Sequence, residues 1–204
     1  MDLISKIINA SFRYVIRTSK IYNIDESHSL KHSMEVYNFA RDIYSSEVKN
    51  NPFLVNQQSI IYSSAILHDM CDKKYLDEAE GVNSIKNLLI NYMSKEELNV
   101  VSNIITTMSY SKVMVKGFPN LGNYQLAYHI VREADLLAAY DIDRCVLYGM
   151  NVEGLQFTSA RDRAKILFSV RVLNYKTNNL FLTDYSKNKS LELHNRAVDV
   201  LKNM

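Results

Sequence analysis

An adjacent histidine and aspartate end an otherwise apolar stretch of the sequence. His68 and Asp69 follow the run SSAIL and precede the charged stretch MCDKKY. An imidazole nitrogen and a carboxylate oxygen can pair with each other, transfer protons or bind a divalent cation. Polar groups at the end of a buried helical run are costly unless they have a partner. The pair therefore indicates either a buried polar contact or a chemical site.

Two further segments carry such side chains in apolar helical settings. Upstream, His28 and His32 are four residues apart in SHSLKHSMEVY, a spacing that places two rings on one face of a helix. Downstream, Asp135 interrupts the apolar run of READLLAAY. A single bound cation would explain all three intrusions, with His32, His68, Asp69 and Asp135 as its ligands.

The chemistry of these four side chains suits one divalent cation. Imidazole nitrogens and carboxylate oxygens bind manganese, iron, cobalt, zinc or magnesium, and four protein ligands leave positions for water. Water on such a cation has a pKa near 7 instead of about 15.7, so hydroxide becomes available at neutral pH. A second metal would need more ligands. His129 lies six residues before Asp135, roughly 120° away on a helix, so we interpret it as structural.

The order His32, then His68-Asp69, then Asp135 resembles the H...HD...D signature of the HD-domain superfamily of metal-dependent phosphohydrolases. The segments HSLKH, HDMCDKKY and READLLAAYDIDR are most similar to the branch of nucleoside-triphosphate pyrophosphohydrolases, with its HDxxH, HDxxDxK and DADRLDA-like segments. The resemblance covers about residues 27–144. It implies an all-α fold, a metal held by these four residues and hydrolysis of nucleotide phosphates.

Three positions depart from the pattern of that branch. Ser29 stands where Asp usually follows the first His, Glu35 stands where Arg is frequent, and Glu133 replaces the Asp before Asp135. The departures leave the four ligands intact but affect the residues that shape the substrate pocket. A protein that keeps the metal for stability and only binds nucleotides is therefore the alternative to an enzyme.

Three residues near the motifs are candidates for catalysis. The resemblance assigns Asp72 and Lys74 to the middle motif, with Lys74 as a phosphate contact. Asp72 could orient or deprotonate the attacking water or protonate a leaving oxygen, and the alternative is an ordinary surface carboxylate. His28 could hydrogen-bond to phosphate or to metal-bound water, or it could cap its helix.

Further candidates for substrate binding lie downstream. Arg132, one turn before Asp135, could clamp a phosphate or pair with that carboxylate. Residues 109–123 contain two glycines and a proline, so we expect the longest loop there, long enough to close over a nucleotide. Tyr110 would then line a base pocket and Lys112 would contact phosphate, although a half-buried packing role is the alternative for this tyrosine.

The substrate that we expect is a small nucleotide. Pyrophosphohydrolysis of a nucleoside triphosphate is the first choice, because the HDxxDxK resemblance implies it. Monophosphatase or phosphodiesterase action is the runner-up, because the same site can present hydroxide to any phosphorus within reach. The formal net charge is only +2 and Lys and Arg are scattered, so no nucleic-acid partner is required and a long polyanion is disfavoured.

The composition favours a single all-α domain. Of 204 residues, 47% are hydrophobic, and there are only five glycines and two prolines, which favours helices over a turn-rich β fold. Apolar residues recur at helical spacing nearly throughout. We expect an HD-type helical bundle with one metal site between helices, built from residues 1–204, with a motif-bearing core at 27–144 and flanking helices at 1–22 and 157–203.

Three helix boundaries within the core bear on the site. We expect a central helix at residues 54–71 that contains the His-Asp pair. A fourth helix should begin after Gly81. Ser94-Lys95-Glu96-Glu97 has the form of a capping box, so a fifth helix should begin there and end near Thr107.

Nothing in the sequence indicates a membrane or an oxidising compartment. No stretch has the length of a membrane span, and the N-terminal segment lacks the pattern of a signal peptide. Cys71 and Cys145 are the two cysteines, far apart in the sequence, and Cys71 has the setting of a small buried thiol. We expect a cytoplasmic protein that could form a homodimer.

Overall fold

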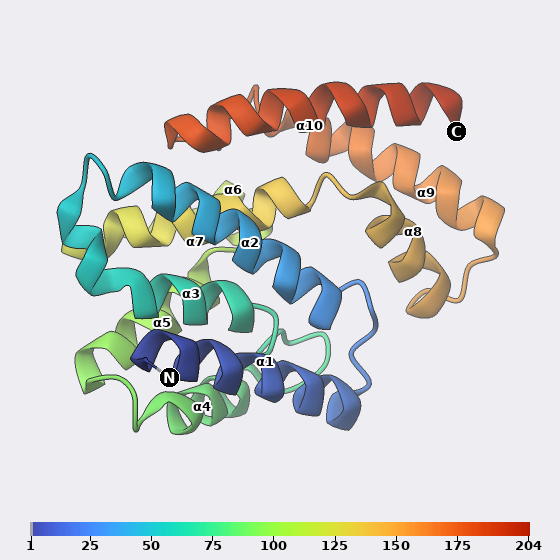
Figure 1. Ribbon diagram of the computed structural model, residues 1–204. Coiled ribbons are helices and arrows are strands. Elements are labelled where there is room, and N and C mark those ends of the chain that lie inside the picture. Colours follow the sequence, from blue (N-terminus) through green and yellow to red (C-terminus); the bar gives the residue numbers. More distant parts are fainter. Residues whose placement is uncertain (1) are drawn as a thin grey trace.

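The computed structural model describes residues 2–204, and the chain is all-helical over that range, which confirms the predicted fold class (Figure 1). Ten α-helices and three short 3-10 helices follow one another without a β-strand in the described part. They are α1 Leu3–Tyr22, α2 Leu30–Glu47, η1 Pro52–Gln57, α3 Gln58–Leu67, α4 Glu78–Leu89, α5 Lys95–Thr107, α6 Tyr110–Lys116, η2 Gly122–Tyr124, α7 Gln125–Ala138, α8 Ile142–Asn151, α9 Phe157–Val170, η3 Val172–Asn174 and α10 Asp184–Asn203.

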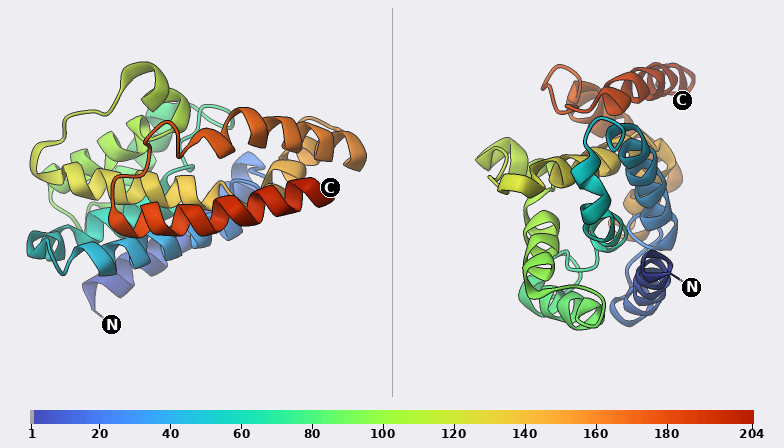
Figure 2. Two further views of the ribbon diagram at one scale, coloured as in Figure 1. Left: turned by 90° about the horizontal axis from the view of Figure 1, so that it is seen from above. Right: turned by 60° about the vertical axis from the view of Figure 1, so that its left-hand side comes forward.

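Helix α3 is the centre of the bundle. Every residue from 60 to 67 is buried, and α1, α2, α5 and α7 pack around it (Figure 2). A helix that is apolar on all sides is stable only when it is surrounded in this way. The α-helix is shorter than predicted, because residues 52–57 form a 3-10 helix and α3 ends at Leu67. His68 and Asp69 therefore lie in the turn that follows α3.

Helix α4 packs closely onto that turn. Asp77 caps α4 by accepting a hydrogen bond from the Glu80 amide, so the helix begins before Gly81 and not after it as predicted. A Cβ at Gly81 would lie 2.7 Å from Cys71 Cβ and 2.8 Å from Cys71 Cα. Only glycine allows this approach. The close packing fixes the position of the segment that carries the His-Asp pair.

The prediction of a long loop at residues 109–123 is wrong. Residues 110–116 form α6 and residues 122–124 form η2, so the irregular part is short. Gly117 ends α6 with a φ of 72°, a left-handed conformation that glycine adopts without strain. The glycines and the proline in this segment thus mark helix ends. Tyr110 and Lys112 consequently lie on a helix.

The predicted start of α5 is confirmed. The Ser94 side chain accepts a hydrogen bond from the Glu97 amide, and the Glu97 carboxylate accepts one from the Ser94 amide. This reciprocal pair satisfies two amides at the helix start that have no partner within the helix. The helix ends at Thr107, also as predicted.

The last three helices flank the bundle. Helix α10 packs against α2 and α7, whereas α8 and α9 pack against each other at one end, near the start of α2 (Figure 1). Glu133 on α7 is fully buried and accepts hydrogen bonds from the Leu182 amide at 2.8 Å, the Thr183 amide at 3.1 Å and Thr183 Oγ1 at 2.7 Å. The motif departure at Glu133 thus attaches the start of α10 to the core. None of the helices within residues 2–204 is long and apolar enough to cross a membrane.

Candidate metal centre

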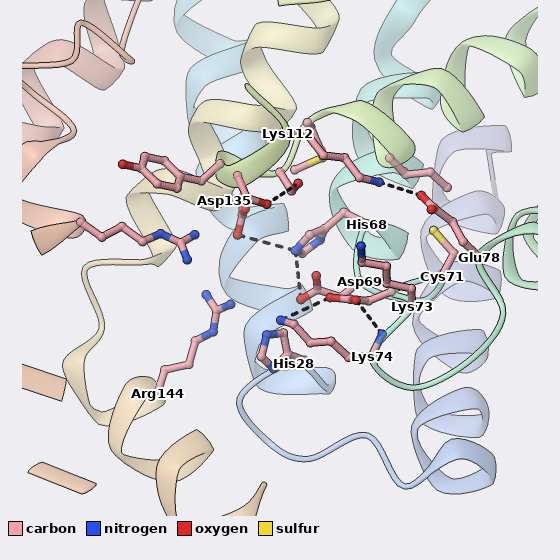
Figure 3. A pocket seen from close by; sticks show the side chains of 17 residues that line it. His28, His68, Asp69, Cys71, Lys73, Lys74, Glu78, Lys112, Asp135 and Arg144 are labelled. Carbon is pink, nitrogen blue, oxygen red and sulfur yellow. Dashed lines mark hydrogen bonds and ion pairs between the residues drawn. The ribbon is translucent and has the colours of Figure 1, made fainter. Parts of the chain in front are cut away.

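The structure brings the four predicted metal ligands together. His32 comes from α2, His68 and Asp69 from the turn after α3, and Asp135 from α7. The Nε2 atoms of the two histidines lie 3.1 Å apart. Asp69 Oδ2 is 3.4 Å from His32 Nε2 and 3.3 Å from His68 Nε2. Asp135 Oδ1 is 3.4 Å and 3.6 Å from the same two atoms. Figure 3 shows both carboxylates beside the same edge of the His68 ring, Asp135 to its left and Asp69 below it.

These distances fit a divalent cation. Ligand bonds of about 2.1 Å separate neighbouring donor atoms by about 3.0 Å in an octahedron and about 3.4 Å in a tetrahedron. His32, His68 and Asp135 form a group whose ligand atoms all lie within 4.8 Å of one another, and this group could hold a metal ion. Asp69 Oδ2 is buried and, apart from its ion pairs with the two histidines, has no hydrogen-bond partner. A cation would satisfy this oxygen, so the residues present fit the metal that the sequence predicts.

The backbone around α3 orients His68 for metal binding. Its Nδ1 atom lies 2.9 Å from the carbonyl oxygen of Ala65, within the last turn of the helix. If Nδ1 carries the proton, it donates to this carbonyl and Nε2 keeps a lone pair for a cation. A second hydrogen bond of this kind is the usual support of a metal-ligating histidine.

Burial and mutual attraction set the protonation of the four groups. Burial lowers the pKa of His32 to about 4, so this ring is neutral at pH 7. Burial opposes the charge of His68 as well, but Asp69 and Asp135 outweigh it and raise the pKa of His68 to about 9. Burial also opposes ionisation of the two aspartates, yet the histidines hold both pKa values well below their usual range. A divalent cation would replace the proton on His68, so its binding releases protons.

A cavity of about 270 Å³ opens beside this group (Figure 3). Its walls come from the turn after α3, from α6, from α8 and from the segment after α9. His68, Asp69 and Asp135 line it, so a molecule in the cavity can reach these three candidate ligands, whereas His32 lies behind them. Five other residues that the sequence predicts for catalysis or substrate binding line the same cavity: His28, Asp72, Lys74, Tyr110 and Lys112.

His28 is held in place through one ring nitrogen. Ser27 Oγ lies 2.6 Å and Tyr75 Oη 3.2 Å from His28 Nδ1, and the Tyr75 hydroxyl donates to Asp25 Oδ2 at 2.8 Å. These contacts leave Nε2 as the ring nitrogen available to the cavity. Helix α2 begins after His28, with Ser29 as its N-cap residue, so His28 is not the cap. The arrangement favours contact with a ligand over the capping alternative.

Asp72 and Lys74 form a compact turn at the edge of the cavity. Asp72 Oδ1 accepts a hydrogen bond from the Lys74 amide at 2.9 Å, and the Lys74 Nζ atom lies 3.4 Å from Asp72 Oδ2. The Lys74 side chain is 49% exposed, so a ligand phosphate can reach its ammonium group. Asp72 therefore stabilises the turn and also places a carboxylate at the cavity wall.

Helix α6 contributes the two residues that were predicted in a loop. Lys112 Nζ donates to Glu78 Oε1 and to the Thr106 carbonyl, each at 2.7 Å. Tyr110 lies beneath the guanidinium of Arg171, whose Cζ atom is 4.5 Å from the ring centroid. Both side chains are thus fixed by neighbours before any ligand binds.

Arg132 does not belong to this cavity. Its side chain is 1% exposed and donates to Glu133 Oε1 at 3.1 Å, and its Cζ atom lies 4.7 Å from the ring centroid of Phe118. It pairs with Glu133 and not with Asp135, so neither predicted role for this arginine matches its contacts. Glu35 also lies outside the cavity and lines a separate depression beside Lys31.

Three cationic residues at the cavity were not predicted. Lys73, Arg144 and Arg171 line it together with Lys74 and Lys112. Arg144 Nε donates to the Ser27 carbonyl at 2.5 Å, and its guanidinium points into the pocket (Figure 3). Arg144 is the last residue of READLLAAYDIDR, so its place beside the third motif was a usable signal. Arg171 had no such signal, because the packing of α9 against α8 brings it to the site.

No protein-family model matches the chain, and no curated protein sequence is significantly similar to it. Among solved structures, the chain is similar to the crystal structure of a Lactobacillus plantarum protein that was a Northeast Structural Genomics target. The TM-score is 0.73 and the sequence identity is 18%, over 97% of this chain and 94% of that one. At this identity the likeness shows the fold alone.

Proposed function

We propose that the protein is a metal-dependent phosphohydrolase of the HD-domain type that acts on small nucleotides. One observation carries the proposal: three of the four candidate metal ligands line a cavity that five basic side chains also line. Ammonium and guanidinium groups beside a cation site are the recurring recognition elements for phosphoryl groups. The five are Lys73, Lys74, Lys112, Arg144 and Arg171.

His32, His68, Asp69 and Asp135 would hold the cation. When bound, it supplies an acidified water and offsets negative charge on phosphoryl oxygens. The side chains at the cavity bind the phosphates and transfer protons. Arg144 is fixed through Ser27, so its terminal N–H groups can bind two phosphoryl oxygens with little loss of side-chain entropy.

Two groups at the cavity can move protons. Asp72 can accept a proton from the attacking water or return one to a leaving oxygen, provided that the substrate brings that oxygen within hydrogen-bond reach. His28 presents Nε2 to the same cavity, while Ser27 and Tyr75 fix the ring through Nδ1. Lys74, beside Asp72, contacts the phosphate.

Pyrophosphohydrolysis of a nucleoside triphosphate is the reaction that we propose. A triphosphate carries several negative charges, which the cations at the cavity can offset, with Lys74 and Lys112 shared between the ligand and their partners Asp72 and Glu78. The oxygen of water forms a bond to the α-phosphorus, the bond from that phosphorus to the bridging oxygen breaks, and pyrophosphate leaves with the electron pair. The proton of the attacking water passes to a carboxylate or imidazole at the cavity.

Phosphorus NMR of a nucleotide panel, with manganese, cobalt or magnesium present, tests this proposal. We expect pyrophosphate and a nucleoside monophosphate as the products. Asp69→Asn should abolish turnover, while Glu35→Gln, a carboxylate change outside the cavity, should retain it. Orthophosphate released only from monophosphates, or loss of diester signals, would replace the proposed reaction with the runner-up. Nucleotide binding without any turnover would identify a binding protein.

A further inference from the structure

A second cavity of about 290 Å³ adjoins the first. The two share His28, Lys74, Arg144 and Arg171, so these four side chains form a common wall. A ligand that reaches the candidate metal ligands in the first cavity can therefore extend past this wall into the second. The two cavities together form one elongated site.

The second cavity differs in chemistry from the first. It contains none of the candidate metal ligands, and its lining has no aspartate or glutamate. Four cations line it, three of them from the shared wall and the fourth Arg163, which is paired with Glu153. The rest of the lining is mostly apolar or aromatic: Ala139, Cys145, Tyr148, Leu167, Val172 and Tyr175. Such a lining suits an uncharged ring system attached to an anion.

Aromatic and guanidinium groups in this cavity are already ordered. Two cations lie over the ring of Tyr148. Lys74 Nζ is 5.6 Å from the ring centroid, and Arg163 Cζ is 5.3 Å from it. Arg171 Nε donates to the Tyr175 hydroxyl at 3.2 Å, which fixes the guanidinium plane at the shared wall. Tyr175 itself is fully buried, so the guanidinium planes and the Tyr148 ring are the groups that can stack on a flat heterocycle, and ordered groups lose little entropy when they do so.

We propose that the second cavity binds the nucleoside part of a nucleotide whose phosphates lie in the first cavity. The inference rests on the proposed function only in that it places the phosphates beside the candidate metal ligands. Lys74, Arg144 and Arg171 at the shared wall contact the phosphates nearest the nucleoside. Most of the nucleoside contacts come from α8, α9 and η3, which lie largely beyond the motif-bearing segment. The candidate metal ligands and the residues that would select the nucleoside thus come from different parts of the chain.

A pair of matched probes isolates this contact. Methylenediphosphonate carries the anionic groups alone, whereas the α,β-methylene diphosphates of the four common nucleosides carry the same groups joined to a nucleoside. Isothermal titration calorimetry with both kinds of probe measures binding without any need for turnover. We expect the wild type to bind at least one nucleoside probe at least tenfold more tightly than methylenediphosphonate.

Leu167→Trp should fill the second cavity without touching the first. We expect the tenfold advantage of the nucleoside probe to disappear, while the Kd for methylenediphosphonate changes less than twofold. Ile166→Trp is the matched control, because Ile166 precedes Leu167 on α9 and is 65% exposed. Ile166→Trp should still bind the nucleoside probe at least tenfold more tightly than methylenediphosphonate. Equal binding of both probes by the wild type, or an advantage that survives Leu167→Trp, would overturn the proposal.

Cys145 supplies a second readout if Leu167→Trp does not fold. Its thiol lines the second cavity, so a nucleoside probe should slow its reaction with methyl methanethiosulfonate, and methylenediphosphonate should not. The measurement uses Cys71→Ser protein, in which Cys145 is the one remaining cysteine. Equal protection by both probes would contradict the placement of the nucleoside. A wild type that binds the nucleoside probe in the second cavity but hydrolyses no nucleotide would contradict only the proposed hydrolysis.

Discussion

The Nε2 atoms of His32 and His68 face each other across 3.1 Å, and Asp69 Oδ2 lies within 3.4 Å of both. Two protonated Nε2 atoms would repel each other at this distance, so at most one of them carries a proton. Burial favours a neutral His32, whereas the carboxylates favour a charged His68. One proton between the two Nε2 atoms therefore suits these four side chains. A divalent cation in the same position would bind both nitrogens and both carboxylates.

The first prediction is that the wild type binds close to one equivalent of a divalent transition metal. Elemental analysis should find it, and Asp135→Asn or His68→Ala should remove it, whereas Glu35→Gln should not. Manganese at 100 times its Kd should stabilise the wild type by about 2.7 kcal/mol in thermal unfolding. Wild-type protein that binds no metal after reconstitution would contradict this prediction.

Two arginines should separate ligand binding from stability. Arg171→Met removes a cation from the wall shared by the two cavities, so we expect the Kd for nucleotide to rise at least tenfold with little change in folding. Arg132→Met breaks a fully buried ion pair with Glu133, and we expect a loss of about 3 kcal/mol in the free energy of unfolding. Calorimetric titration and urea unfolding of both variants measure the two effects. The opposite assignment of effects would show that Arg132, not Arg171, reaches the ligand.

The grouping of the candidate metal ligands could be predicted from the sequence better than the boundaries of the helices that carry them. His32, His68, Asp69 and Asp135 were recognisable because costly side chains interrupt apolar helical runs, and such intrusions need a common partner. The capping box at Ser94 was predictable because both of its contacts are local. The end of α3 could not be predicted, because apolar residues continue at helical spacing past Leu67 into the turn.

Contacts between distant segments account for most of the rest. Arg171 reaches the cavity because α9 packs against α8, and no local pattern reports that packing. Gly117 and Pro119 do lie in an irregular stretch, but the predicted loop was too long, because a short helix begins at Tyr110 and ends just before Gly117. Arg132 resembles a phosphate ligand by its spacing from Asp135, but the next residue, Glu133, pairs with it in the core.

The pH dependence of stability should carry a contribution from His129. Burial, with a smaller effect of Arg132, lowers the pKa of this imidazole to about 4 in the folded protein, against about 6.5 in the unfolded chain. Well above pH 6.5 the ring is neutral in both states and does not contribute to the pH dependence. As the pH falls from 6.5 towards 4, only the unfolded chain takes up the proton, so His129 increasingly destabilises the fold.

His129→Gln should therefore lose less stability than the wild type over this interval. Urea unfolding of both proteins at pH 7 and pH 5 gives the difference, and the titration of the His129 ring by NMR checks its cause. A ring that titrates near pH 6.5 in the folded protein would show that the proposed origin of the effect is incorrect.

Gly81→Ala should weaken both the fold and the metal site. Alanine has the higher helix propensity, by about 1 kcal/mol, so an exposed helical position would gain stability. At Gly81 the added Cβ would lie 2.7 Å from Cys71 Cβ, and such overpacking costs about 1–3 kcal/mol, so we expect a net loss. Because Cys71 follows Asp69 by two residues, its displacement should also raise the Kd for manganese.

Asn83→Ala, on the exposed side of α4, is the matched control and should gain a few tenths of a kcal/mol without affecting the Kd for manganese. Urea unfolding and manganese titration of both variants make the comparison, and equal behaviour would show that α4 can move away from the turn without cost.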